Sequence, residues 1–168
     1  MRFKELKDEY KIEFKKQMII SFQTGFENYT GKKEDQVLPE RDIDDCLNDK
    51  NGHGYMMLDD NNQLLGGLIV NIDEETNINH LDFIFVVVGS QSKGIGEAMW
   101  HEVEKRYPKT KIWRTCTPYF DRRNIHFYVN KLKFKIIEFW NAYHPDPNMP
   151  DDFIGDDGDG MFEFEKII

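Results

Sequence analysis

The segment at residues 86–100, which reads VVVGSQSKGIGEAMW, has the residue types and spacing of a phosphate-binding turn. An apolar run with strand character leads into a turn that holds Gly94 and Gly96, and a helical pattern starts directly after it. The first amides of a helix have no partners within the helix, and the helix dipole is positive at that end. The glycines let a phosphate approach these amides closely, and Lys93 adds a positive charge. The segment therefore predicts a binding site for a phosphorylated ligand.

Two familiar phosphate-binding motifs fit this segment poorly. A Walker loop requires G-x-x-x-x-G-K-[ST], but Ile95 and Gly96 stand after Gly94 where Lys and Ser or Thr belong. A Rossmann fingerprint requires G-x-G-x-x-G after the first strand, whereas here two of the three glycines follow several predicted strands. A third pattern, Q/R-x-x-G-x-G/A after a valine-rich strand, matches residues 91–96. A nucleotide-binding protein stays open as an alternative on the residues alone.

Together with a second segment, the third pattern resembles the GNAT superfamily of N-acetyltransferases. Residues 86–108 look like the acetyl-CoA pyrophosphate loop of that superfamily and the helix that follows it. Residues 123–140, RNIHFYVNKLKFKIIEFW, look like its second conserved block, in which a Phe-Tyr pair on a helix precedes a Gly-Phe strand start. The resemblance covers most of the chain. It implies one acetyltransferase domain over residues 1–168 with acetyl-CoA as its co-substrate.

The resemblance also implies which residues contact the cofactor. Val86 and Val88 would offer main-chain groups to the pantetheine arm, and Asn124 would contact the cofactor from the helix of the Phe-Tyr pair. Two positions depart from the family pattern, because Lys133 replaces the glycine before the strand and Asp121 stands where Asn is common. The pyrophosphate would be held by the amides of six consecutive residues: Gln91, Ser92, Lys93, Gly94, Ile95 and Gly96.

Acetyl transfer to an amine needs a base and an acid. A lysine-like amine has a pKa of about 10.4, so at neutral pH its proton must be removed before it attacks. Asp82, the only ionised side chain in the apolar run at 78–88, is the candidate base, and His80, on the same strand face, is the second candidate. Tyr128 takes the position that in the family points at the CoA sulfur, so it is the candidate acid. A solvent-facing Asp82 and a merely packed Tyr128 are the alternatives.

The expected reaction is direct attack of a primary amine on acetyl-CoA in a ternary complex, without a metal. A non-catalytic CoA-binding or regulatory module on the same scaffold is the competing hypothesis. The resemblance places Trp140, Tyr143 and His144 at the acceptor pocket, and the acidic C-terminal region favours a cationic acceptor. The partner is thus expected to be a small-molecule or peptide amine, and a homodimer stays open.

The charge of the chain is unevenly distributed, which bears on its partners. The 22 Lys and Arg residues and 31 Asp and Glu residues give a net charge of −9, which argues against general nucleic-acid binding. Residues 89–135 nevertheless hold 11 of the basic residues and 4 acidic ones, whereas residues 136–168 hold nine acidic residues and one lysine. An anionic ligand at the glycine turn and a cationic acceptor would require this pattern. Clustering on solvated faces is the alternative.

Signals for a membrane, export or a metal site are lacking. The sequence has no apolar run near the roughly 20 residues of a membrane span, and its first residues lack the apolar core of a signal peptide. We therefore expect no membrane association and a cytoplasmic location. Cys46 and Cys116 form no spaced motif, so no disulfide or metal framework is expected. The acidic run at 156–160 lacks the spacing and closing Glu of a calcium loop and predicts a turn.

The elements that must position these groups form a mixed α/β fold, with a mostly antiparallel sheet and helices on both faces. Apolar residues at helical spacing, such as Phe14, Met18 and Phe22, predict the first helix. Asp121 is the predicted N-cap of the last helix. Helices are expected at 10–28, 40–47, 95–107 and 122–132, and strands at 55–58, 63–70, 78–88, 111–117, 134–140 and 161–167.

Overall fold

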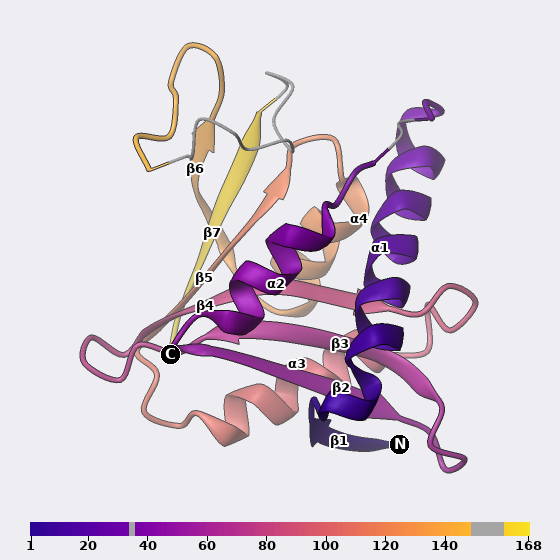
Figure 1. The fold of residues 1–168 in the computed structure, drawn as a ribbon. Coiled ribbons are helices and arrows are strands. Elements are labelled where there is room, and N and C mark those ends of the chain that lie inside the picture. Colours follow the sequence, from indigo (N-terminus) through magenta and orange to yellow (C-terminus); the bar gives the residue numbers. More distant parts are fainter. Residues whose placement is uncertain (34–35, 149–159) are drawn as a thin grey trace.

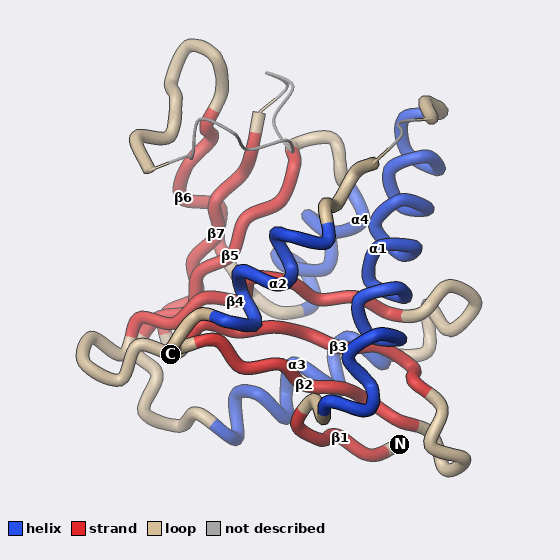
Figure 2. Tube along the Cα trace, in the orientation of Figure 1, coloured by secondary structure: helices blue, strands red, loops and turns tan. Residues whose placement is uncertain are grey.

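Seven strands form one sheet in the computed structural model, which describes residues 1–33, 36–148 and 160–168 (Figure 1; Figure 2). Their order across the sheet is β1-β2-β3-β4-β5-β7-β6. Neighbouring strands are antiparallel except β4 and β5, so the predicted mixed, mostly antiparallel α/β fold is confirmed. The strands are β1 (Arg2–Glu5), β2 (Gly52–Leu58), β3 (Leu64–Asn71), β4 (Ile78–Val86), β5 (Ile112–Pro118), β6 (Lys135–Trp140) and β7 (Met161–Ile167).

Helices cover both faces of this sheet and bury two apolar cores (Figure 1). On one face lie α1 and α2, whose Phe14, Met18 and Ile43 are fully buried. On the other face α3 packs together with η1, through residues that include Trp100 and Tyr128. The helices are α1 (Asp8–Thr30), α2 (Glu40–Asn48), α3 (Ile95–Arg106), α4 (Arg122–His126) and the π-helical turn η1 (Phe127–Lys131). None of the helices in the described residues has the length and apolar content that a bilayer span requires.

The sheet divides between β4 and β5. These parallel strands pair over three residues only, from Ile78 opposite Ile112 to His80 opposite Arg114. Beyond that point β4 continues to Val86 and β5 to Pro118 without pairing to each other. In Figure 1, β5, β6 and β7 run upward and away from β2, β3 and β4. Past this point the facing edges of β4 and β5 lack strand partners in the described chain. A ligand can enter the sheet between them.

A β-bulge in β4 lies beside this separation, at Asp82. Phe83 pairs with Ile69 of β3 and Leu81 pairs with Val70, so Asp82 is the extra residue of the bulge. Residues two apart normally share a face of a strand. Here Leu81 instead packs in the core on the α3 side, while Phe83 packs against Phe22 of α1. The bulge thus re-aims the Asp82 side chain toward the helices α1 and α2.

The predicted elements are confirmed with three differences. The expected strand at 78–88 ends at Val86, so Val88 lies in the turn that follows and not in a strand. The expected helix at 122–132 divides into α4 and η1, because the Leu132 amide reaches back five residues to Phe127. The edge strand β1 was not predicted, since Phe3, which stacks on Tyr55, is its single apolar residue. Residues 156–159 of the predicted acidic turn lie outside the described residues.

Candidate active site

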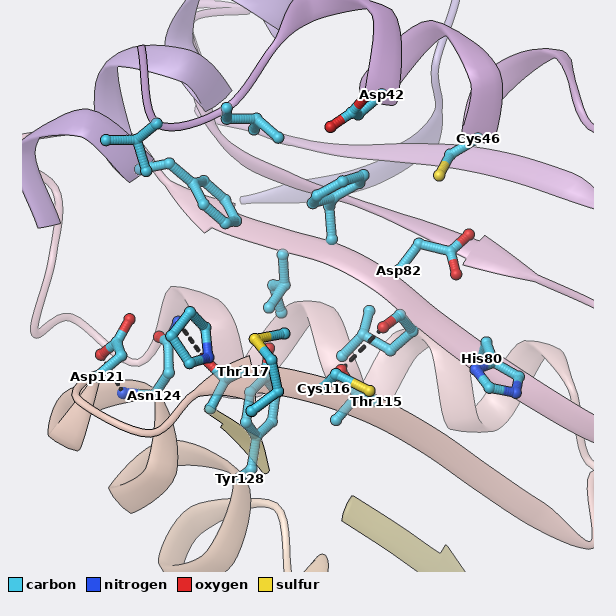
Figure 3. A pocket seen from close by; sticks show the side chains of 18 of the residues that line it. Asp42, Cys46, His80, Asp82, Thr115, Cys116, Thr117, Asp121, Asn124 and Tyr128 are labelled. Carbon is cyan, nitrogen blue, oxygen red and sulfur yellow. Dashed lines mark hydrogen bonds between the residues drawn. The ribbon is translucent and has the colours of Figure 1, made fainter. Parts of the chain in front are cut away.

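A cavity of about 790 Å³ opens where β4 and β5 separate (Figure 3). At its base the Thr115 hydroxyl donates a hydrogen bond to the Leu81 carbonyl at 2.9 Å, where a continued strand pair would use a backbone amide. Residues of α1, α2, β4, β5 and α4 line the walls. The cavity therefore connects the two helix-covered sides of the sheet through the gap in its middle.

Asp82 faces the cavity on the α2 side, near Cys46 and Asp42 (Figure 3). Burial and, to a lesser extent, the negative charge of Asp49 raise the pKa of Asp82 to about 7, although the contact with the Cys46 thiol partly opposes the rise. A carboxyl group with this pKa is about half ionised at neutral pH. Such a group can accept a proton and release it again under physiological conditions, as a general base must.

His80, the second candidate base, lines the same cavity (Figure 3). Part of its ring reaches solvent, yet the surrounding protein and the positive charge of Arg114 lower the pKa of the imidazole, while Glu163 partly opposes this. The ring is therefore mainly neutral at pH 7. Both predicted bases thus lie in one cavity, on the same side of the sheet.

Tyr128 lines the cavity from the opposite side, in the π-helical turn η1. The residue is 4% exposed, and its ring packs on Phe134 and Phe164 with centroid distances of 6.0 and 5.4 Å. Its backbone carbonyl accepts a hydrogen bond from the Phe134 amide at 2.9 Å. Burial raises the pKa of Tyr128, so the phenol keeps its proton at neutral pH. The side chain is a rigidly held hydroxyl donor.

Asn124 and Asp121 form the start of α4 beside Tyr128. Asp121 Oδ1 accepts a hydrogen bond from the Asn124 amide at 2.9 Å, which confirms the predicted N-cap. The Asn124 side chain donates to Thr117 Oγ1 at 3.5 Å and lines the cavity (Figure 3). Burial is also the main cause that raises the pKa of Asp121. The predicted cofactor contact of α4 therefore lies on the same wall as the predicted acid.

The glycine turn lies further along β4, between Val86 and the start of α3. Gly94 has φ of +73°, a left-handed conformation that favours glycine, and Ser92 shares this region with φ of +64°. In the described chain, the amides of residues 91–97 have no hydrogen-bond acceptor, whereas the Gln91 side chain accepts from the Gly89 amide at 2.8 Å. The turn therefore presents a row of free amides, with the exposed Lys93 beside them.

Three other predicted cofactor contacts have additional structural roles. A Cβ on Gly96 would lie 3.0 Å from the Phe127 ring, so this glycine lets α3 approach η1 closely. Ile95 is buried in the core on the α3 side. The Val86 carbonyl accepts a hydrogen bond from the Ser21 hydroxyl of α1 at 3.1 Å, and Val88 is 42% exposed beyond the strand end.

The predicted acceptor-pocket residues do not all lie at the cavity. Trp140 lines it, but Tyr143 is 98% exposed, and His144 stacks on Trp140 and contacts Glu138 without lining the cavity. The prediction is therefore wrong for Tyr143 and His144, because the chain turns back after β6 through a bridge between Asn141 and His144 and carries both outward.

Several lining residues were missed by sequence reasoning. Thr115 and Cys116 follow each other on β5, and Asp42, Asp45 and Cys46 share one side of α2. The spacing of the α2 residues, three and four apart, is a signal that could have identified a common face.

The cavity wall is acidic, because it carries more carboxylates than basic side chains. Among the described residues its basic side chains are Arg41 and His80. Its carboxylates are Asp42, Asp45, Asp82, Asp121 and Asp146.

No three His, Cys, Asp or Glu side chains in residues 1–33, 36–148 and 160–168 come together as a group that could hold a metal ion. Burial raises the pKa of both cavity cysteines, Cys46 and Cys116, to about 12. Both thiols therefore stay protonated and weakly nucleophilic at neutral pH.

Known proteins are similar to this chain in sequence or in fold. The chain is 38% identical over 162 residues to the uncharacterized protein YrkN of Bacillus subtilis (strain 168). The aligned region covers 93% of this chain and 87% of that protein. A Bacillus subtilis acetyltransferase in complex with CoA is 15% identical, with a TM-score of 0.69 over 99% of this chain and 98% of that one. A GNAT family acetyltransferase from Elizabethkingia anophelis with acetyl-CoA bound is 16% identical, with a TM-score of 0.68 over 99% and 97%.

The match to a family model is broader than any single motif. Residues 14–134 match the model described as the acetyltransferase (GNAT) family. This range runs from α1 through the divided sheet and the glycine turn to the residue that precedes β6. The chain belongs to the acetyltransferase (GNAT) family.

Proposed function

We propose that this acetyltransferase moves the acetyl group of its co-substrate, acetyl-CoA, to a cationic primary amine by direct attack in a ternary complex. The observation that carries the proposal is the cavity at the gap between β4 and β5. Asp82, with a pKa of about 7, faces this cavity from one side of the sheet, and the protonated Tyr128 faces it from the other. A base and an acid on opposite sides of one opening suit a reaction between two substrates that enter from different sides. Residues 1–168 would act as a single domain.

In this proposal Asp82 takes one proton from the ammonium form of the acceptor. The neutral nitrogen then attacks the thioester carbonyl, so that a C–N bond forms and the C–S bond breaks. Tyr128 gives its proton to the leaving sulfur, which releases CoA as a thiol. After the attack the nitrogen still carries one proton more than the amide product needs. This proton passes to the phenolate of Tyr128, and the proton on Asp82 passes to solvent. A positioned acid or base of this kind contributes about 100- to 10,000-fold to a rate.

The glycine turn is the proposed pyrophosphate site. The free amides from Gln91 to Gly96 support this role, as do the left-handed Gly94 and the exposed Lys93. Main-chain groups of Val86 and Val88 would accompany the pantetheine arm, and Asn124 would contact it from α4. Since Ser21 already engages the Val86 carbonyl, we propose that the cofactor uses the other main-chain groups at this end of β4.

The acidic cavity wall supports a cationic acceptor. Its carboxylates outnumber the basic side chains in the lining, and aromatic rings such as Phe22, Phe120 and Trp140 stand among them. Carboxylates attract a protonated amine, and ring faces contribute cation–π attraction. The acceptor class that fits is a polyamine-like molecule or a basic side chain of a peptide.

A panel of amines tests the proposal. CoA release from acetyl-CoA would be measured with a polyamine, a lysine-containing peptide and a neutral hydroxylated amine of similar size. We expect release with a cationic member of the panel and formation of the acetylated amine in equal amount. Binding of acetyl-CoA without CoA release for any amine would favour a non-catalytic CoA-binding module instead.

A further inference from the structure

We infer that Trp140 makes the cavity specific for a cationic acceptor, and that His144 and Glu163 hold its indole in position. The inference rests on the proposed function and deepens it, because it names the surface that binds the positive charge of the amine. Trp140 ends β6 and lines the cavity, whereas His144 and Glu163 lie outside the lining. These two residues therefore act on the acceptor through Trp140.

His144 covers one face of the Trp140 indole. The two rings are nearly parallel, with 4.8 Å between their centroids and 16° between their planes. His144 Nε2 lies 3.2 Å from Glu138 Oε2, which holds the far side of the imidazole. The main chain is held too, because the Asn141 amide donates to the His144 carbonyl at 3.0 Å and the His144 amide donates back at 2.9 Å. The turn after β6 thus returns the imidazole to the tryptophan that ends the strand.

Glu163 fixes the N–H edge of the same indole. The ring nitrogen of Trp140 donates to Glu163 Oε2 at 3.1 Å. An indole has this one donor and no acceptor, so the bond sets the rotation of the ring. With one face under His144 and the N–H edge on Glu163, the ring lines the cavity with the surface that remains.

That remaining surface suits a positively charged group. Tryptophan is the aromatic side chain with the strongest cation–π attraction. Glu163 lies opposite Cys116 in the pairing of β5 with β7, so its carboxylate shares the sheet face of Cys116, which lines the cavity. An ammonium group gains from both the ring and the carboxylate, whereas a neutral group of the same size gains little from either.

The three tryptophans of the chain differ in environment, which provides a direct probe. Trp100 and Trp113 are fully buried and pack on each other at a centroid distance of 5.1 Å. Trp140 is half-buried at the cavity. An amine that binds there should therefore change the fluorescence of this one tryptophan.

Tryptophan fluorescence would be titrated in the full chain with CoA present. The cationic probes are 1,4-diaminobutane and a lysine-containing peptide, and 1,4-butanediol is the neutral match of the diamine. We expect a saturable change with at least one of the two cations and none with the diol. The response should be lost in W140L. No response to either cation, or an equal response to the diol, would overturn the inference.

Steady-state kinetics separate the positioning role from a general loss of structure. We expect W140L to raise KM for the cationic amine about fivefold, as for the loss of a partly exposed cation–π contact, with kcat and KM for acetyl-CoA little changed. H144A should raise the same KM by a smaller factor, and H144F, which keeps a stacked ring, should restore it. E163Q, which keeps an acceptor for the indole N–H and removes the charge, should raise it too. Y143A is the matched control, because Tyr143 lies on the same turn and is 98% exposed.

The outcomes distinguish this inference from the proposed function. Unchanged KM for the amine in W140L would overturn the specificity role, and unchanged KM in H144A with a raised KM in W140L would overturn the positioning role. If W140L does not fold, the comparison of H144A with H144F decides in the same way. A cation-specific fluorescence response without CoA release for any amine would count against the proposed transfer and support the amine-binding surface.

Discussion

The Thr115 hydroxyl of β5 donates a hydrogen bond to the Leu81 carbonyl of β4 at 2.9 Å, directly beyond the last paired residues of the two strands. A continued parallel pair would use a backbone amide here, so a side chain has taken over the role of the next donor. The sheet stays joined at this point while its two halves separate. The cavity, and the groups that face one another across it, follow from this change of donor.

Replacement of Tyr128 by Phe removes the proposed acid and keeps the packed ring. We expect kcat to fall about 10- to 100-fold, while the affinity for acetyl-CoA changes little. Tyr107→Phe is the matched control, because its hydroxyl lies 2.5 Å from that of Tyr55 and outside the cavity lining. The control should alter stability and leave kcat near the wild-type value. Equal kcat values for Tyr128→Phe and wild type would remove Tyr128 from the mechanism.

Asp82→Asn is expected to stabilise the fold above about pH 7. Burial and the Asp49 charge raise the pKa of Asp82 from its ordinary 3.8 to about 7, so the folded state binds the proton more tightly than the unfolded state. The free energy of unfolding therefore falls as the pH rises from about 4 to about 7, by an amount on the order of 3 kcal/mol. Denaturant unfolding of both proteins near pH 4.5 and pH 8 measures this. A stability difference that does not grow with pH would contradict it.

Lys133→Gly should be more stable than Lys133→Ala by about 1 kcal/mol. Lys133 has φ of +69°, in the left-handed region that glycine adopts without strain. Its Nζ donates to the Asn130 carbonyl at 2.7 Å, and both variants lose this bond, so their difference isolates the backbone strain. Thermal unfolding of the pair measures it, and an alanine variant as stable as the glycine variant would show that the strain is absent.

Neutralising the α2 wall should weaken acceptor binding. We expect the double variant Asp42→Asn, Asp45→Asn to raise KM for a cationic amine several-fold, with a smaller effect at high salt because screening weakens charge attraction. Asp44→Asn is the control, since Asp44 pairs with Lys15 of α1 at 2.9 Å and does not line the cavity. Equal KM values for the double variant and the control would argue against a cationic acceptor held by α2.

Local sequence signals predicted most of the elements. The turn at Gly94, the cap at Asp121 and the helical spacing around Phe14 all depend on neighbours within a few residues, and each was found as expected. The site was predicted in part, because a strand residue such as Asp82 can be identified by its charge alone. Its bulge could not be foreseen, since the bulge depends on the register with Val70 and Ile69 of another strand.

The remaining site residues depend on contacts between distant segments. Thr115 gains its role from the point where β4 and β5 stop pairing, and Asp42 from the way α2 packs over the gap. Helical spacing could place Asp42 on one face of α2 with Asp45 and Cys46, but nothing near Asp42 or Thr115 in the sequence shows which distant segment the residue faces. The error at Tyr143 has the same origin, because a bridge after β6 turns that residue outward.

The most direct test of the account is the pH dependence of kcat/KM for acetyl transfer, from about pH 5.5 to 9, in wild type and Asp82→Asn. Asp82 accepts a proton only when it is ionised, and its pKa is about 7. The account predicts that kcat/KM of the wild type rises with pH and inflects near pH 7. This inflection adds to the rise that deprotonation of the amine itself causes. Asp82→Asn should be much slower and lack this inflection. A wild-type profile without it, or an Asp82→Asn profile that keeps it, would contradict the account.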